Sequence, residues 1–137
     1  MAIKKYPHLL PQEVKIWDQF IARYGADYDR FEYDVHVGDI PTEFNHLVGN
    51  DLHAVKSIYR ARIDVVGFRG NDAFIFEIKP QAGLSAYGQI LGYMSMYEAE
   101  FSPAGELRGA IVTNIVSSPA KKLFVDAGFL IFIFPVA

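Results

Sequence analysis

Three charged side chains close together in the chain could carry hydrolytic chemistry on a phosphate ester. Asp64 stands in one apolar segment, and Glu77 and Lys79 stand in the next. If these segments are adjacent strands, alternate residues share a face, so the two carboxylates and the ammonium group can meet. Two carboxylates in an apolar sheet repel each other and are costly to bury unless a cation pairs with them. The spacing therefore predicts a site for a divalent metal ion.

Magnesium suits such a site because it prefers oxygen ligands, needs only one or two carboxylates and keeps positions for water and substrate phosphate. A bound ion of this kind polarises a phosphoryl oxygen and lowers the pKa of its bound water. A neighbouring lysine can orient that water or stabilise the charge that develops in the transition state. The alternative is a solvated hairpin end that carries an Asp, a Glu and a Lys by chance.

The two apolar segments have the pattern of a β-hairpin. Residues 57–68 predict one strand, residues 69–72 a turn and residues 73–79 a second strand, with Pro80 ending it. In the first strand, one face is expected to carry Ile58, Arg60, Arg62 and Asp64. In the second, Ala73, Ile75, Glu77 and Lys79 are expected to share a face.

Apolar periodicity predicts the remaining elements. Helices are expected at 11–24, 84–98 and 120–127, and strands at 31–37, 107–114 and 128–134, with a long irregular connection at 38–56. The order is α-β-β-β-α-β-α-β. It predicts an α/β fold with a mixed central sheet flanked by helices on both faces, in a single domain over residues 1–137.

At this point the pattern resembles that of a known group of enzymes. The segment Arg62–Asp64 (RID), followed after twelve residues by Glu77–Lys79 (EIK), resembles the motif of the PD-(D/E)XK phosphodiesterase superfamily. That superfamily includes restriction endonucleases, archaeal Holliday-junction resolvases and RecB-type nucleases. Its restriction-endonuclease-like α-β-β-β-α-β core is similar to the predicted order over residues 11–114. The proline that precedes the family's first acid is absent, since Ile63 stands there.

The resemblance also implies roles for particular residues. Asp64 and Glu77 would bind the metal ion, the backbone carbonyl of Ile78 could join them, and Lys79 would assist the nucleophilic water. Many members carry a further acid on the first helix. Glu13 matches that position, although a glutamate in a first turn is also favoured by the helix dipole alone. Glu32 and Glu43 are weaker substitutes.

The helix predicted after the hairpin carries polar residues on one face. Ser85, Gln89 and Tyr93 are spaced four apart. The segment from Gln89 to Tyr93 resembles the Gln-x-x-x-Tyr element of RecB-type nucleases, in which these two residues lie beside the metal and contact substrate. The alternative is an ordinary helix edge on which Tyr93 packs as a half-buried ring. Gly88 and Gly92 are expected to pack closely on the sheet.

Two arginines could bind DNA phosphates on either side of the scissile bond. Arg60 and Arg62 would point the same way as Asp64 if the strand alternation holds, and a guanidinium binds phosphate well. The alternative is ion pairing with residues 24–55, which hold one arginine against seven acidic residues.

Composition excludes several other functions. There is no cysteine, and His36, His46 and His53 lack zinc-site spacing. The chain has no Gly-rich phosphate loop, so no nucleotide cofactor is expected. The longest apolar run, 128–136, is too short to cross a bilayer and is expected to be a buried strand, and residues 1–7 lack the apolar stretch of a secretory signal. The net charge of −3 does not by itself indicate a nucleic-acid partner.

These observations predict a small Mg²⁺-dependent nuclease that acts on DNA, with Mn²⁺ able to replace Mg²⁺. The rival hypotheses are a catalytically inactive module of the same fold that binds nucleic acid or serves in assembly, and a plain structural domain. A homodimer is expected from the apolar last strand and the 15% aromatic content. The cysteine-free composition fits the cytoplasm, or that of the host if the gene is carried by a phage.

Overall fold

The computed structural model describes residue 6, residues 8–40 and residues 42–136. Residues 1–5, 7, 41 and 137 lie outside this description. The expectation that residues 1–7 form no secretory signal therefore falls mostly outside the described residues. Helices and short 3-10 turns are α1 (Pro11–Tyr24), η1 (Gly25–Asp27), η2 (Thr42–Phe44), α2 (Gly49–Tyr59), α3 (Leu84–Phe101) and α4 (Ser118–Asp126). The strands are β1 (Arg30–Val37), β2 (Ala61–Arg69), β3 (Asp72–Ala82), β4 (Leu107–Val116) and β5 (Leu130–Ile133).

The strands form one mixed sheet in the order β1-β2-β3-β4-β5. The pairs β1–β2 and β2–β3 are antiparallel, and β3–β4 and β4–β5 are parallel. This arrangement confirms the predicted mixed sheet and the α/β class. It follows from the connections, because a tight turn joins β2 to β3 whereas helices carry the chain between the parallel strands.

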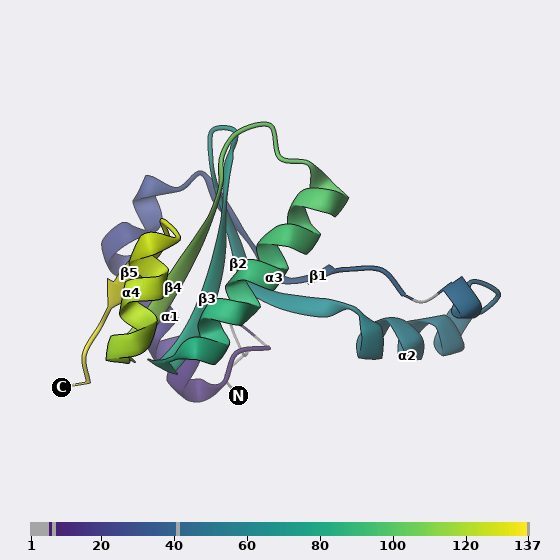
Figure 1. Cartoon of the computed structure of the whole chain (residues 1–137), viewed down its shortest axis with the longest axis horizontal. Coiled ribbons are helices and arrows are strands. Elements are labelled where there is room, and N and C mark those ends of the chain that lie inside the picture. The colour runs from purple at the N-terminus through teal and green to yellow at the C-terminus, as the bar shows by residue number, and fades with distance from the viewer. Residues whose placement is uncertain (1–5, 7, 41, 137) are drawn as a thin grey trace, which may run out of the picture.

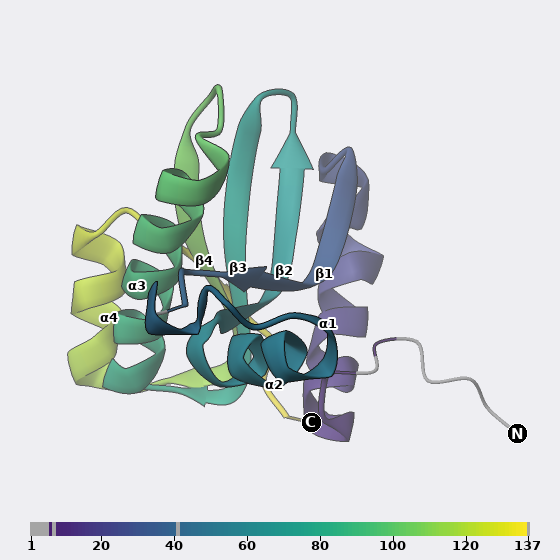
Figure 2. The same cartoon turned by 90° about the vertical axis from the view of Figure 1, so that its right-hand side faces the viewer.

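Helices cover both faces of this sheet (Figures 1 and 2). On one face, Trp17 and Phe20 of α1 are fully buried and their rings lie against Phe76 at centroid distances of 5.3 and 5.1 Å. On the other face, Ile90 of α3 and Phe124 of α4 pack over Ile111 of β4. The predicted helix at 11–24 is confirmed, since its apolar residues recur at helical spacing and contact one sheet face.

Strand β3 runs past the point where the sequence predicts its end. Pro80 was expected to stop the strand, but pairing with β4 continues through Gln81 and Ala82. Beyond Phe76, β3 no longer pairs with β2. The missing N–H of Pro80 therefore costs the sheet no bond to β2, which is the situation in which a strand tolerates proline.

The prediction of an irregular connection at 38–56 and of a strand from residue 57 is wrong. Helix α2 occupies Gly49–Tyr59, and β2 begins only at Ala61. Arg60 is the residue that follows the helix and has extended backbone, so Ile58 and Arg60 do not belong to the face that was expected to carry Asp64. Asp51 lies in the first turn of α2 and Lys56 in its last, where each charge favours the helix dipole.

Residues 38–60 form an arm that projects from the sheet (Figure 1). None of its described side chains is buried. Both roots of the arm are attached to Glu100, near the end of α3. Glu100 Oε1 accepts the Gly38 N–H at 3.3 Å, and Glu100 Oε2 accepts a bond from Arg60 Nη2 at 2.7 Å. Glu100 therefore holds the arm at its base.

Strand β5 lies at an edge of the sheet because it pairs only with β4. The expectation of a buried last strand is wrong in this respect: Leu130, Ile131 and Phe132 are half-buried, and Ile133 is 43% exposed. Among the described residues, no helix combines the length and the hydropathy needed to cross a bilayer.

Strands β1 and β2 change faces at the same level of the sheet. Tyr33 and Val65 pair and pack in the core under α1, whereas the next pair on the same face by simple alternation, Val35 and Ile63, packs in the core under α3. Asp34 lies between these pairs with a φ of +55°, a value uncommon for a residue other than glycine. The predicted alternation from 31 to 37 is therefore interrupted there.

Candidate active site

Asp64 stands where β2 separates from β3. The ladder between the two strands ends at Val65 and Phe76, so the main chain of Asp64 has no pairing partner on β3. Its side chain takes over this role, because Asp64 Oδ2 accepts the Ile78 N–H at 3.0 Å. The carboxylate is thereby directed across to β3, next to Glu77.

Glu77 is a buried acid with an unmatched oxygen. Its side chain is 5% exposed, and Oε2 has no hydrogen-bond partner among the described residues. Burial, followed by the close Asp64 carboxyl, raises the pKa of Glu77 to about 9. The Lys79 ammonium opposes this shift and Glu13 adds to it slightly. A buried carboxyl with a free oxygen atom beside a half-buried one is an arrangement that a bound cation would stabilise.

The donor set at this position suits a hard divalent cation. Asp64 and Glu77 offer two carboxylates, and Ile78 lies between Glu77 and Lys79 on β3. Within the described chain, no group of three His, Cys, Asp or Glu side chains is arranged to hold a metal ion. A tetrahedral zinc site is therefore not formed there, whereas Mg²⁺ is commonly held by one or two carboxylates with water completing its shell.

Helix α3 brings Tyr93 to the same region and carries Gln89 one turn earlier. Burial raises the pKa of Tyr93 to about 12, and the charges of Glu77 and Asp64 contribute to this shift, so its hydroxyl lies near both acids. The side-chain oxygen of Gln89 is buried and has no partner in the described chain. Ser85, one turn earlier, is exposed. Gly88 and Gly92 do not pack on the sheet as expected, because a Cβ at either would meet nothing within 4 Å.

Glu13 on α1 lies close enough to influence Glu77, but its carboxylate has a local partner. Glu13 Oε1 accepts the Leu10 N–H at 3.0 Å, which caps the start of its own helix. Glu32 forms an ion pair with Arg30 at 3.4 Å, and Glu43 is exposed on the arm. Of Glu13, Glu32 and Glu43, only Glu13 has a charge that affects the pKa of Glu77 among the described residues.

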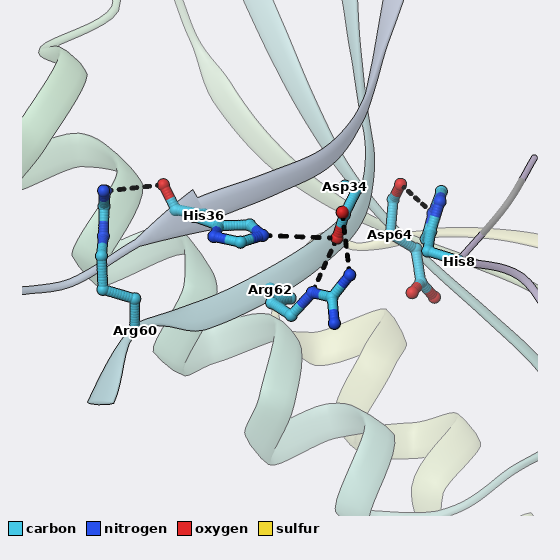
Figure 3. A network of polar contacts seen from close by, with 6 residues as sticks. All are labelled: His8, Asp34, His36, Arg60, Arg62 and Asp64. Carbon is cyan, nitrogen blue, oxygen red and sulfur yellow. Dashed lines mark hydrogen bonds and ion pairs between the residues drawn. The ribbon is translucent and has the colours of Figure 1, made fainter. Parts of the chain in front are cut away.

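The two arginines have different surroundings (Figure 3). Arg60 is held at the base of the arm, where its Nη2 also donates to the His36 carbonyl at 2.8 Å. Arg62 points toward Asp34 and forms two bonds of 2.8 Å with its carboxylate. The charge of Asp64 also acts on Arg62. The expectation that Arg60 lies on a strand face with Asp64 is therefore wrong, whereas Arg62 lies on β2 within reach of the Asp64 charge.

Sequence reasoning missed two neighbours of Asp64. His8 Nε2 lies 2.9 Å from the Asp64 carbonyl oxygen, although 56 positions separate these residues in the chain. Asp34 and Asp64 are the unpaired residues between the pairs Tyr33–Val65 and Val35–Ile63 of the β1–β2 ladder. No local pattern around His8 indicates this contact. For Asp34, the high acid content of its segment was the available signal. His46 and His53 are exposed on the arm, and neither contacts the site in the described structure.

Comparisons with known proteins bear on the fold. No family model matches the chain, and no curated protein matches it. Among solved structures, a repair endonuclease from Pyrococcus abyssi superposes with a TM-score of 0.57 at 17% identity, over 98% of this chain and 50% of that one. A complex of EndoMS with double-stranded DNA gives 0.54 at 16% identity, over 98% and 49%. A protein of unknown function, AF1548, gives 0.55 at 17%, over 87% and 56%.

The chain thus spans about half the length of these proteins. The likeness concerns the fold, which is that of the repair endonucleases and is consistent with the PD-(D/E)XK nuclease fold expected from the RID and EIK segments. The molecule is therefore an α/β domain with the fold of these solved structures, and it carries two adjacent acids at the point where β2 and β3 separate.

Proposed function

We propose that this protein is a Mg²⁺-dependent nuclease that hydrolyses phosphodiester bonds of DNA. The observation that carries the proposal is the pairing of Asp64 with buried Glu77, whose Oε2 has no partner in the described chain. Such a pair is unfavourable without a cation, and a hard divalent ion bound to oxygen ligands is the simplest remedy. The fold shared with repair endonucleases adds support.

In this mechanism Asp64 and Glu77 would hold the ion, the Ile78 carbonyl could add a third oxygen ligand, and Glu13 would be a further acid nearby. When bound, the ion activates a water molecule and polarises the phosphoryl group. The Ile78 N–H fixes one oxygen of Asp64 and so orients the carboxylate. Lys79 stabilises negative charge at the phosphorus in the transition state. Gln89, Tyr93 and Ser85 position the substrate from α3.

DNA is the proposed substrate because a structural neighbour was solved in complex with double-stranded DNA. The acidic pI of about 5.7 requires that binding rest on local positive groups and not on overall charge. Arg62 is such a group beside the acid pair. A cytoplasmic location is proposed with this function, because a cysteine-free chain suits a reducing compartment.

The test is cleavage of supercoiled plasmid in Mg²⁺, in Mn²⁺ and in EDTA. We expect cleavage with either metal and none in EDTA. Asp64→Asn and Lys79→Ala should each reduce the rate by roughly 100-fold or more while the protein stays folded. Lys122→Ala is the matched control. Lys122 pairs with Asp126 on α4. This helix packs near β4, and β3 separates β4 from β2 in the sheet. Cleavage that persists in EDTA, or that survives both substitutions, contradicts the mechanism.

A catalytically inactive module of the same fold is the rival, and the acidic pI favours it. Calorimetric titration with Mn²⁺ separates the two hypotheses. The nuclease requires Mn²⁺ binding that Asp64→Asn and Glu77→Gln abolish. An inactive binding module requires no metal binding that depends on these carboxylates.

We further propose that the protein forms a homodimer through the β5 edge. Ile133 and Val136 are 43% and 80% exposed there, and residues 128–137 contain no charged side chain. Exposed apolar edge strands without protecting charges readily pair with another strand. Sedimentation velocity should show a dimer for the wild type and a monomer for Ile133→Lys. A wild-type monomer throughout the micromolar range would show that this expectation is wrong.

A further inference from the structure

A second polar cluster lies beside the proposed metal ligands, on β1 and β2 (Figure 3). At its centre the Arg62 guanidinium binds both oxygens of the Asp34 carboxylate at 2.8 Å. The His36 ring approaches the same carboxylate at 3.6 Å. His8 lies near enough for its charge to act on Asp34. Arg62 and His36 thus both approach the Asp34 carboxylate, and His8 lies nearby against Asp64.

The geometry of this contact is that of an anion-binding site. The planar fork of arginine binds carboxylate and phosphate in the same bidentate manner. The site is also accessible, since Arg62 is 55% exposed and Asp34 33% exposed. An ion pair with this much exposure contributes little to stability, so another anion can replace the carboxylate without disturbing the core.

The backbone gives an independent indication that Asp34 does more than support the strand. Its φ of +55° is unusual in the middle of a strand, and such conformations gather at functional sites. The same residue separates the two pairs at which β1 and β2 change faces. In this conformation, the carboxylate of Asp34 on β1 lies beside Arg62 on β2. Asp64 is on the same strand as Arg62, two positions further along.

We propose that Arg62 binds a backbone phosphate next to the scissile one, and that Asp34 occupies this phosphate site until DNA displaces it. The proposal rests on the proposed nuclease function and adds to it a specific subsite. In the free protein, Asp34 neutralises Arg62. In the complex, a phosphate oxygen pair takes the place of the two carboxylate oxygens, and Asp34 turns to solvent.

The experiment measures binding of a short fluorescent DNA duplex by anisotropy in EDTA, so that no hydrolysis occurs. Asp34→Asn removes the competing charge and keeps a side chain that tolerates positive φ. We expect it to bind DNA about threefold to tenfold more tightly. Arg62→Gln should bind about threefold to tenfold more weakly, and its dependence of log affinity on log salt should fall by about one.

The double variant distinguishes displacement from simple repulsion. If Asp34 acts by occupying Arg62, then Asp34→Asn has no effect in the Arg62→Gln background. If Asp34 only repels DNA at a distance, it tightens binding by the same factor in both backgrounds, and the proposal is wrong. The proposal is also wrong if Asp34→Asn weakens binding, because Asp34 then serves to orient Arg62 toward the DNA.

Matched controls account for net charge. Asp126→Asn removes an acid from another exposed ion pair, Lys122–Asp126 at 2.6 Å, and Arg108→Gln removes an exposed arginine from β4. Both should leave the affinity within about twofold of wild type. Cleavage in Mg²⁺ is measured in parallel. If the wild type does not cleave DNA but the variants show the predicted binding pattern, the proposed nuclease activity is wrong and the proposed phosphate site stands. If the wild type cleaves DNA and Asp34→Asn binds DNA no more tightly than the wild type, only the proposed phosphate site is wrong. The phosphate site is also wrong if the wild type does not bind DNA.

Discussion

At the scale of single residues, Glu77 is the side chain with the most unusual environment. It is buried in the middle of the apolar strand β3, lies close to another acid and has an oxygen without a partner in the described chain. Its pKa is raised to about 9 from an ordinary value of 4.5. The native state without metal therefore retains a proton that the unfolded chain releases across this range of pH.

This shift predicts how the metal-free protein responds to pH. Between about pH 4.5 and 9, the unfolded state binds fewer protons at this position than the native state, so stability falls as pH rises. Glu77→Gln cannot ionise and should lack this loss. We expect the variant to exceed the wild type by roughly 1–3 kcal/mol in free energy of unfolding at pH 8 in EDTA, with a much smaller difference at pH 4.

Urea unfolding at the two pH values provides the measurement. Glu106→Gln is the control, because Glu106 is 74% exposed and should follow the wild type. Parallel stability curves for wild type and Glu77→Gln would show that Glu77 is ionised and paired in the metal-free protein.

The proximity of Asp64, Glu77 and Lys79 could be predicted from the sequence because a short hairpin brings these residues together. The separation of Asp64 from Glu77 fits one turn between two strands, and strand alternation accounts for Glu77 and Lys79. The contacts of His8 and Asp34 could not be predicted from the sequence, for a physical reason. Their contacts with the site depend on where an N-terminal segment and a neighbouring strand lie in three dimensions, and no short-range pattern encodes that.

At the scale of elements, apolar periodicity predicted the helices and strands that contact the core. Helix α1 was found where Val14, Trp17 and Ile21 recur at helical spacing. Helix α2 was missed because none of its described side chains is buried, so no strong amphipathic pattern marks it. The extension of β3 past Pro80 could not be predicted either, since it depends on the early end of β2.

Helix α3 must sit close to β4 if Gln89 and Tyr93 are to reach the acid pair. Gly109 permits this approach, because a Cβ there would collide with Ile90 of α3 and lie 2.9 Å from Phe129. We expect Gly109→Ala to lower the free energy of unfolding by about 1–3 kcal/mol and to slow cleavage by displacing the helix. Urea unfolding and plasmid cleavage measure the two effects.

The matched control is Gly88→Ala on the same helix. A Cβ at Gly88 meets nothing within 4 Å, so the change should stabilise the protein by about 0.5–1 kcal/mol and leave cleavage unchanged. Equal destabilisation by both substitutions would contradict the assignment of Gly109 as the contact that sets the position of α3.

At the scale of the whole molecule, the arm and the sheet are separable. Val37 and Ala61 are the last paired residues at its base, and the described arm side chains contribute nothing to the buried core. Replacing residues 39–59 with an Asn-Gly turn should leave the free energy of unfolding within about 1 kcal/mol of wild type.

Urea unfolding tests the stability of the shortened protein, and cleavage of linear, single-stranded and branched DNA tests its substrate range. We expect plasmid cleavage to continue while preference among these DNA forms changes, because the arm carries none of the proposed metal ligands. An unfolded product would show that the arm is part of the folding unit.

The left-handed backbone at Asp34 has a consequence for transplanting this acid pair into another scaffold. In β1 and β2, alternate side chains that pack under α1 in one half of the strand pack under α3 in the other half. A graft of the β2–β3 hairpin alone would leave out β1, and with it Asp34 and the change of face beside Asp64. A working graft must therefore carry Asp34 and its inverted geometry along with the motif.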